Sequence, residues 1–150
     1  MSPLEPGDVA PAVPGVAFGD APVGLFFYKV TCPTCQMAAP TMRRFDEAFP
    51  GRVIGVGQDP VSALERFSDE HDMGIASIED SHPYRTSDAY GVGSVPTLFL
   101  VGDDGRVLES VAGWDRAGFN HVAATLAELT GSDAALVSTP DDGRPDFKPG

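Results

Sequence analysis

The sequence predicts an α/β fold in which helices flank a central mixed β-sheet. Runs of consecutive apolar residues at 23–29 and 52–57 predict strands that are buried on both faces. Segments 97–101 and 106–111 flank the turn Gly102-Asp-Asp-Gly105 and predict an antiparallel hairpin. Because helical patterns follow each of the first two strands and the hairpin, the elements run as βαβ and then ββα.

Helices are predicted in four segments, which are 36–49, 60–67, 83–90 and 115–131. Pro40 interrupts the first helix and should kink it, whereas Pro60 suits the first turn of the second. Asp115 is a suitable N-cap for the last helix, and Gly131 is a suitable stop. A short strand is also expected at 75–78.

Length and composition indicate a single domain over residues 1–150, with its core at about 8–130. A chain of this length can bury roughly 70% of its unfolded surface, and 42% of its residues are hydrophobic. Residues 1–22 contain five prolines and predict an N-terminal extension with a short strand at 13–18. Residues 132–150 are polar, contain three prolines and predict a loosely held, flexible tail.

The net charge of −12 argues against nucleic acid and anionic membrane surfaces as partners. The longest apolar runs, near 23–28 and 98–101, are far too short to span a bilayer. Residues 1–8 have neither a basic start nor an apolar core, so no signal peptide is predicted. We therefore expect a cytoplasmic protein, or an extracytoplasmic one if a leader has been removed.

Cys32 and Cys35 are the only two cysteines, and they lie between a predicted strand and a predicted helix. Two thiols at this spacing can close a small disulfide ring or bind a soft metal ion. The first sulfur would lie at the helix N-terminus, where free N–H groups and the positive end of the helix dipole favour a thiolate. A C-x-x-C at such a junction is typical of redox sites.

Several segments of the chain resemble the thioredoxin superfamily, in particular its redoxin (TlpA-like) branch. They are 27–40, Ser94-Val-Pro-Thr97, 99–107 with Gly113-Trp114, and Ala89-Tyr-Gly-Val92 after the extra segment 60–90. The resemblance covers roughly residues 8–130. It implies a thioredoxin-like fold with an N-terminal extension and an insert before the cis-proline loop. It also implies thiol–disulfide exchange with protein disulfide or dithiol substrates, through a reductant or oxidant that the sequence does not identify.

In this interpretation the catalytic residues are Cys32 and Cys35. Cys32, at the helix start, would attack the disulfide of a partner and form a mixed disulfide. Cys35, about one helical turn further on and more buried, would attack Cys32 and release the reduced partner. Pro33 and Thr34 complete the active-site loop: Pro33 removes one N–H and stiffens it, and Thr34 places a hydroxyl near the sulfurs.

The resemblance also implies a substrate-binding role for Val95 and Pro96. Val95 would pair its backbone with the bound partner, and Pro96, expected in cis, would pack against Cys32. No metal ion and no other cofactor are expected. Phe26 and Ala38 occupy positions at which many relatives carry an acid that helps move the proton of the second thiol. Their replacement leaves the reaction type in place and makes its speed and direction harder to predict.

Two other functions stay open at this point. A thiol peroxidase would require P-x-x-x-T-x-x-C, but Leu25 and Lys29 stand where the Pro and Thr should be. A soft-metal-binding dithiol module would use the same two cysteines, which fill only half of a zinc tetrahedron. None of the three histidines is spaced to complete that tetrahedron.

Overall fold

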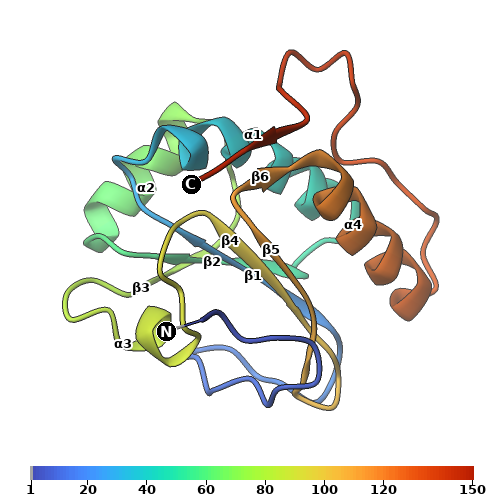
Figure 1. The fold of residues 1–150 in the computed structure, drawn as a ribbon, viewed down its shortest axis with the longest axis horizontal. Coiled ribbons are helices and arrows are strands. Elements are labelled where there is room, and N and C mark those ends of the chain that lie inside the picture. The colour runs from blue at the N-terminus through green and yellow to red at the C-terminus, as the bar shows by residue number, and fades with distance from the viewer. Residues whose placement is uncertain (1) are drawn as a thin grey trace.

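A five-stranded mixed sheet forms the centre of the protein in a computed structural model that describes residues 2–150 (Figure 1). Its strands are β1 (Val23–Tyr28), β2 (Val53–Gly57), β3 (Ser77–Glu79), β4 (Thr97–Val101) and β5 (Val107–Ala112). They lie in the order β3-β2-β1-β4-β5. β1 is parallel to β2 and antiparallel to β4, which confirms the predicted mixed sheet.

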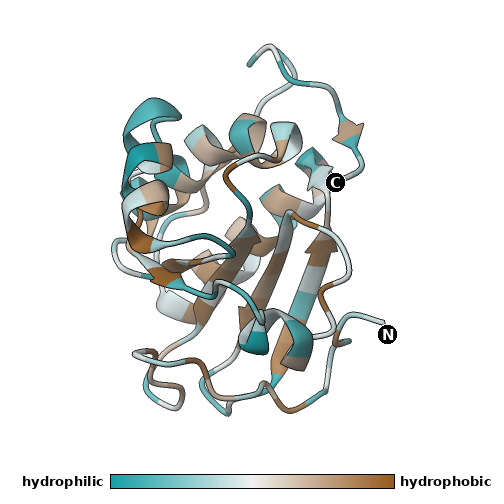
Figure 2. Cartoon of the chain, turned by 90° about the vertical axis from the view of Figure 1, so that its left-hand side faces the viewer, coloured by the Kyte–Doolittle hydropathy of each residue, from teal (hydrophilic) through white to brown (hydrophobic). Residues whose placement is uncertain are grey.

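Four helices cover the two faces of this sheet, and they are α1 (Pro33–Ala48), α2 (Val61–Glu70), α3 (Arg85–Ala89) and α4 (Arg116–Thr130). Figure 1 shows α1, α2 and α4 on one side of the sheet and α3 on the other. Side chains of β1 alternate between the two faces, with Phe26 and Tyr28 toward α1, α2 and α4. Leu25 and Phe27 pack on the opposite face. Every residue of β1 is buried, and Figure 2 shows the apolar strands between the two covering layers.

The predicted helix ends agree with the structure at several positions. The side chain of Asp115 caps α4 by accepting a hydrogen bond from the N–H of Gly118. Gly131 ends α4 in the left-handed conformation, with φ at 65°. Pro40 lies inside α1, which nevertheless continues to Ala48.

The N-terminal extension lies along the sheet face opposite α1, and Val9 forms a single bridge to Arg106. The strand expected at 13–18 is wrong. Val13 is buried, but the N–H of Val16 bonds back to the carbonyl of Val13 and makes a turn. Pro14, which has no N–H to offer a sheet, lies inside this turn.

The segment after α4 runs back to the residues that follow β5. There β7 (Phe147–Lys148) pairs with β6 (Trp114–Asp115), which follows the hairpin (Figure 1). Val137 and Ser138 of this segment are buried. The flexibility expected for residues 132–150 and the single-domain assignment stay predictions. None of the helices described is both long and apolar enough to cross a membrane.

Candidate active site

Cys32 is the N-cap residue of α1. Its backbone is extended, with φ at −85° and ψ at 114°, and Pro33 follows as the first residue of the helix. The Cys32 sulfur accepts a hydrogen bond from the N–H of Cys35 at 3.1 Å. It therefore does what a Ser or Asp oxygen does at other helix starts, namely satisfy one of the free N–H donors of the first turn. The Cys32 sulfur thus lies at the positive end of the helix dipole.

Cys35 differs from Cys32 because its side chain is completely buried. Burial raises the pKa of the Cys35 thiol far above its ordinary value, and the neighbouring Cys32 raises it further. Cys35 is therefore a neutral thiol at neutral pH, whereas Cys32 is half-buried and within reach of solvent. Both cysteines are free thiols in the structure.

The loop before β4 brings the Val95 carbonyl to the Cys32 sulfur. The Val95–Pro96 peptide bond is cis, as expected, and a second cis bond, His82–Pro83, was not anticipated. The Cys32 sulfur lies 3.5 Å from the Val95 carbonyl oxygen, to which it donates as a thiol. The N–H of Gly113 donates to the Pro96 carbonyl at 2.8 Å and ties this loop to the residue between β5 and β6. Residues 63 positions apart in the chain thus form one site.

Pro33 and Thr34, the two residues between the thiols, have different surroundings. Pro33 is exposed, whereas Thr34 is 4% exposed. The Thr34 hydroxyl donates to the carbonyl oxygen of Pro149 at 3.0 Å. The C-terminal segment therefore reaches the active-site loop. Nothing in the polar sequence of residues 146–150 indicates this contact.

The positions at which acids were missing from the sequence, Phe26 and Ala38, are both fully buried among apolar residues. An acid does lie near this part of the site. Asp59 follows β2 and accepts a hydrogen bond from the N–H of Val30 at 2.9 Å. Gln36 donates to the Val30 carbonyl at 3.0 Å, so Val30 is held from both sides just before Cys32. Sequence reasoning missed Asp59, although polar residues at the carboxyl end of a strand are a recognisable signal.

Tyr28 is the other buried titratable group near the thiols. Burial raises its pKa to about 12 against the lowering effect of its hydrogen bond with Ser77, and the charges of Asp59 and Cys35 add to the increase. The Tyr28 hydroxyl lies 2.7 Å from the Ser77 hydroxyl. Tyr28 is therefore a neutral hydrogen-bonding group behind the site. Within residues 2–150, no three His, Cys, Asp or Glu side chains cluster in a way that could hold a metal ion.

The model of the AhpC/TSA family matches residues 16–110 of the chain. This range begins in the N-terminal extension and ends in β5, so it includes both thiols and the cis-proline loop. A search of the curated proteins finds no match.

Three solved structures illustrate the structural similarity. The thioredoxin domain of a thiol-disulfide oxidoreductase from Bacteroides vulgatus is 19% identical, with a TM-score of 0.70, and the match covers 82% of this chain and 99% of that one. A secreted disulfide oxidoreductase of Mycobacterium tuberculosis, described as homologous to E. coli DsbE, is 23% identical, with a TM-score of 0.53 and coverage of 61% and 68%. The dsbF protein of MTB is 25% identical, with a TM-score of 0.63 and coverage of 75% and 82%. These similarities establish a thioredoxin-like fold.

Proposed function

Because the chain belongs to the AhpC/TSA family, and because its two thiols meet a cis-proline loop, we propose that it is a thiol–disulfide oxidoreductase acting on protein disulfides or dithiols. One observation carries this proposal. The Cys32 sulfur caps α1 beside the Val95 carbonyl, with the buried Cys35 one helical turn behind it. An accessible thiol at a helix start, followed one turn later by a buried thiol, is the pair that exchange requires.

In the reducing direction, the Cys32 thiolate attacks one sulfur of the partner's disulfide. The partner's S–S bond breaks, a Cys32–partner disulfide forms, and the partner's other sulfur leaves as a thiolate. Cys35 then gives its proton to that thiolate and attacks the Cys32 sulfur, which forms the Cys32–Cys35 disulfide and breaks the Cys32–partner bond. The second partner sulfur leaves as a thiolate and takes a proton from the solvent. Because burial raises the pKa of Cys35, its thiol keeps the proton until an acceptor such as the departing partner thiolate is adjacent. The same steps in reverse oxidise a dithiol.

The backbone of Val95 supports the assignment of a polypeptide as substrate. Val95 is half-buried and precedes β4, so an extended partner segment can pair with it as an added strand would. The exchange needs only the two thiols and an external dithiol or disulfide, and it includes no step that uses a metal ion or a nucleic acid. A cytoplasmic location stays a prediction from the sequence.

Reduction of insulin by dithiothreitol tests the proposed activity. The wild-type protein should accelerate it at least about tenfold over dithiothreitol alone, and Cys32→Ser should remove the acceleration completely. Cys35→Ser should instead accumulate a mixed disulfide between Cys32 and the substrate, visible on a non-reducing gel. Absence of turnover, together with a Cys32–Cys35 pair that never oxidises, would overturn the proposal.

The family match also supports a second candidate, a thiol peroxidase. The residues around Cys32 argue against it, because Leu25 is a buried residue of β1 and Lys29 replaces the required Thr. We therefore expect the protein to consume hydrogen peroxide no faster than free cysteine at the same thiolate concentration. A Cys32-dependent rate well above that of free cysteine would make the peroxidase the better assignment.

A further inference from the structure

The C-terminal segment crosses the residues that a substrate would contact. β7 pairs with β6 in the register Trp114 to Lys148 and Asp115 to Phe147. This pairing directs the next two residues, Pro149 and Gly150, toward α1 and the cis-proline loop (Figure 1). We call residues 147–150 the strap.

The strap contacts the site through backbone atoms. The carbonyl of Pro149 accepts the Thr34 hydroxyl at 3.0 Å. Gly150 lies so close to the Val95 carbonyl that a β-carbon at this position would collide with it. A β-carbon on Gly113 would come within 2.8 Å of the Lys148 carbonyl oxygen. Glycines at 113 and 150 therefore permit the close approach of the strap.

The strap and the reactive sulfur share one backbone group. The Val95 carbonyl that Gly150 contacts is also the carbonyl 3.5 Å from the Cys32 sulfur. A partner segment paired with Val95 would have to occupy the volume that Gly150 fills. The strap and such a partner consequently exclude each other.

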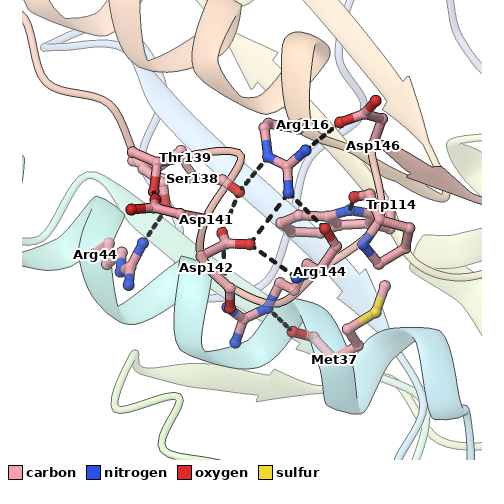
Figure 3. A network of polar contacts seen from close by, with 12 residues as sticks. Met37, Arg44, Trp114, Arg116, Ser138, Thr139, Asp141, Asp142, Arg144 and Asp146 are labelled. Atoms are coloured by element: carbon pink, nitrogen blue, oxygen red, sulfur yellow. Dashed lines mark hydrogen bonds and ion pairs between the residues drawn. The ribbon is translucent and has the colours of Figure 1, made fainter.

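Residues 138–146 hold the strap through a polar network centred on Arg116 (Figure 3). The Arg116 guanidinium, on the first residue of α4, binds the carboxylates of Asp142 and Asp146 and the carbonyl of Arg144. The side chain of Asp142 is 1% exposed, so this ion pair is buried. Arg144 in turn donates to the carbonyl of Met37 in α1 at 2.9 Å. The base of the strap is therefore fixed between α4 and α1.

Residues 147–150 are exposed, in contrast to this anchor. Phe147 is 57% exposed, and the strap is held by the short β6–β7 pairing and the backbone contacts above. A few exposed hydrogen bonds open more easily than a buried ion-pair network. The strap can accordingly leave the site while the anchor stays in place, and it returns readily because the anchor keeps it close.

We propose that residues 147–150 act as an internal pseudosubstrate, which occupies the Val95 carbonyl beside Cys32 and must be displaced by an incoming polypeptide. This inference rests on the proposed function for its biological meaning, but the approach of the strap to Val95 and Thr34 is a property of the structure itself. The strap makes the apparent affinity for a substrate weaker than the intrinsic affinity. The apparent dissociation constant is the intrinsic one divided by the fraction of molecules in which the strap is open.

Deleting residues 147–150 tests the cover without any exchange chemistry. The fully reduced protein is treated with iodoacetamide, and alkylation of Cys32 is followed by mass spectrometry. We expect the deletion to accelerate it about tenfold, which corresponds to about 1.4 kcal/mol of strap docking. Cys35 should remain unmodified in both proteins, because it is buried, and this reports an intact fold. An unchanged or slower rate for Cys32 would overturn the inference.

A point substitution and a peptide provide a second test of the strap. Gly113→Ala should also accelerate alkylation, because its β-carbon would displace Lys148. Its matched control is Gly51→Ala, since both glycines have φ at 74° but nothing lies within 4 Å of a β-carbon at Gly51. The peptide Pro145-Asp-Phe-Lys-Pro-Gly150, at millimolar concentration, should slow alkylation of the deletion variant again, and a scrambled peptide should not. Equal rates for the two alanine variants, or no protection by the peptide, would contradict the strap.

Insulin reduction separates this inference from the proposed function. If both are correct, the deletion lowers KM about tenfold and leaves kcat unchanged. If alkylation accelerates but no variant reduces insulin, the strap stands and the proposed function fails. If insulin is reduced and neither KM nor alkylation responds to the deletion, the proposed function stands and the strap fails.

Discussion

The two ends of the chain are attached to the same sheet in different ways. The N-terminal extension covers one face with apolar side chains, among them Ala10 and Val13, which are 7% and 3% exposed. Its backbone also bonds to β5, and Pro11 accepts the Tyr90 hydroxyl at 2.6 Å. The C-terminal segment is held by polar contacts to a greater extent, among them the ion pairs of Arg116 with Asp142 and Asp146.

This difference shows which end of the chain can respond to a change in pH or salt. Burial of apolar surface depends little on pH or salt, whereas an ion pair requires both charges. The first end belongs to the permanent core of the protein. The second end lies beside the thiols, and its ion pairs weaken when one of their charges is lost.

Replacing Arg116 should have the largest effect. Arg116→Met removes the guanidinium that pairs with the buried Asp142 carboxylate and leaves Arg144, 3.7 Å away, as its only cation among the ion pairs described. This change should lower the free energy of unfolding by about 3 kcal/mol. The C-terminal segment should also become sensitive to trypsin at Arg144, while the N-terminal extension stays protected. Urea unfolding and timed proteolysis measure the two effects. Arg43→Met, which breaks an exposed pair with Asp72, is the control and should change stability by less than about 0.5 kcal/mol. Equal losses in the two variants would refute an ionic attachment.

Truncating a buried apolar residue of the N-terminal extension should lower the free energy of unfolding somewhat less than Arg116→Met does. Val13→Ala removes two buried methyl groups and should lower the free energy of unfolding by about 2 kcal/mol. Because no charge is involved, the loss should be the same at pH 4 and pH 7. Urea unfolding at both pH values checks this. A loss that varies with pH would mean that the two ends are not attached by different forces.

Acid should loosen only the C-terminal segment. Burial alone would raise the pKa of Asp142, but hydrogen bonds from Ser138, the Arg144 N–H and Arg116, with the charge of Arg144, lower it to about 2. Asp146, the other carboxylate on Arg116, faces the same guanidinium. Because the folded-state pKa of Asp142 lies below its ordinary value, its contribution to stability is present above about pH 4 and is lost as the pH falls through 2.

Comparison of wild type with Asp142→Asn at several pH values measures this contribution. The stability difference between the two proteins in urea should be constant from pH 4 to pH 7 and should shrink toward zero at pH 2. Asp133→Asn, in an exposed part of the same segment, should show no such trend. A difference that persists undiminished at pH 2 would exclude the carboxylate charge as its source.

The smallest effect is expected at Phe147. Its side chain is 57% exposed, so Phe147→Ala should change the free energy of unfolding by less than about 0.5 kcal/mol. Chemical denaturation provides the measurement. A loss above about 1 kcal/mol would show that the strap is held by apolar contact, like the N-terminal extension, and would remove the contrast.

Much of the sheet and helix framework could be predicted because its signals are local. The apolar run of β1, the turn between β4 and β5, and the cap at Asp115 each involve residues a few positions apart. The strand expected at 13–18 failed for a local reason as well, since Pro14 interrupts it. The resemblance of Val95-Pro96 to a cis-proline loop correctly predicted a cis bond and a loop opposite Cys32, although the contact that the structure records is between the Cys32 sulfur and the Val95 carbonyl.

The parts of the site that could not be predicted depend on partners far away in the chain. Asp59 supports Val30 across the loop from β2, and Pro149 reaches Thr34 across 115 positions. The polar, proline-containing segment 132–150 has no periodic pattern from which its contacts could be predicted. Its place depends on the Arg116 guanidinium, a hydrogen-bonding fork that becomes available only once α4 has formed.

Local features of the sequence set the α/β order of elements and place a dithiol at the start of a helix. Those features follow from spacing, capping and the burial of consecutive apolar residues, which act over a few positions. Contacts between distant segments instead place Asp59 at the Val30 N–H and bring residues 149–150 beside Thr34 and the Val95 carbonyl. Such contacts depend on segments that meet only after the sheet has assembled.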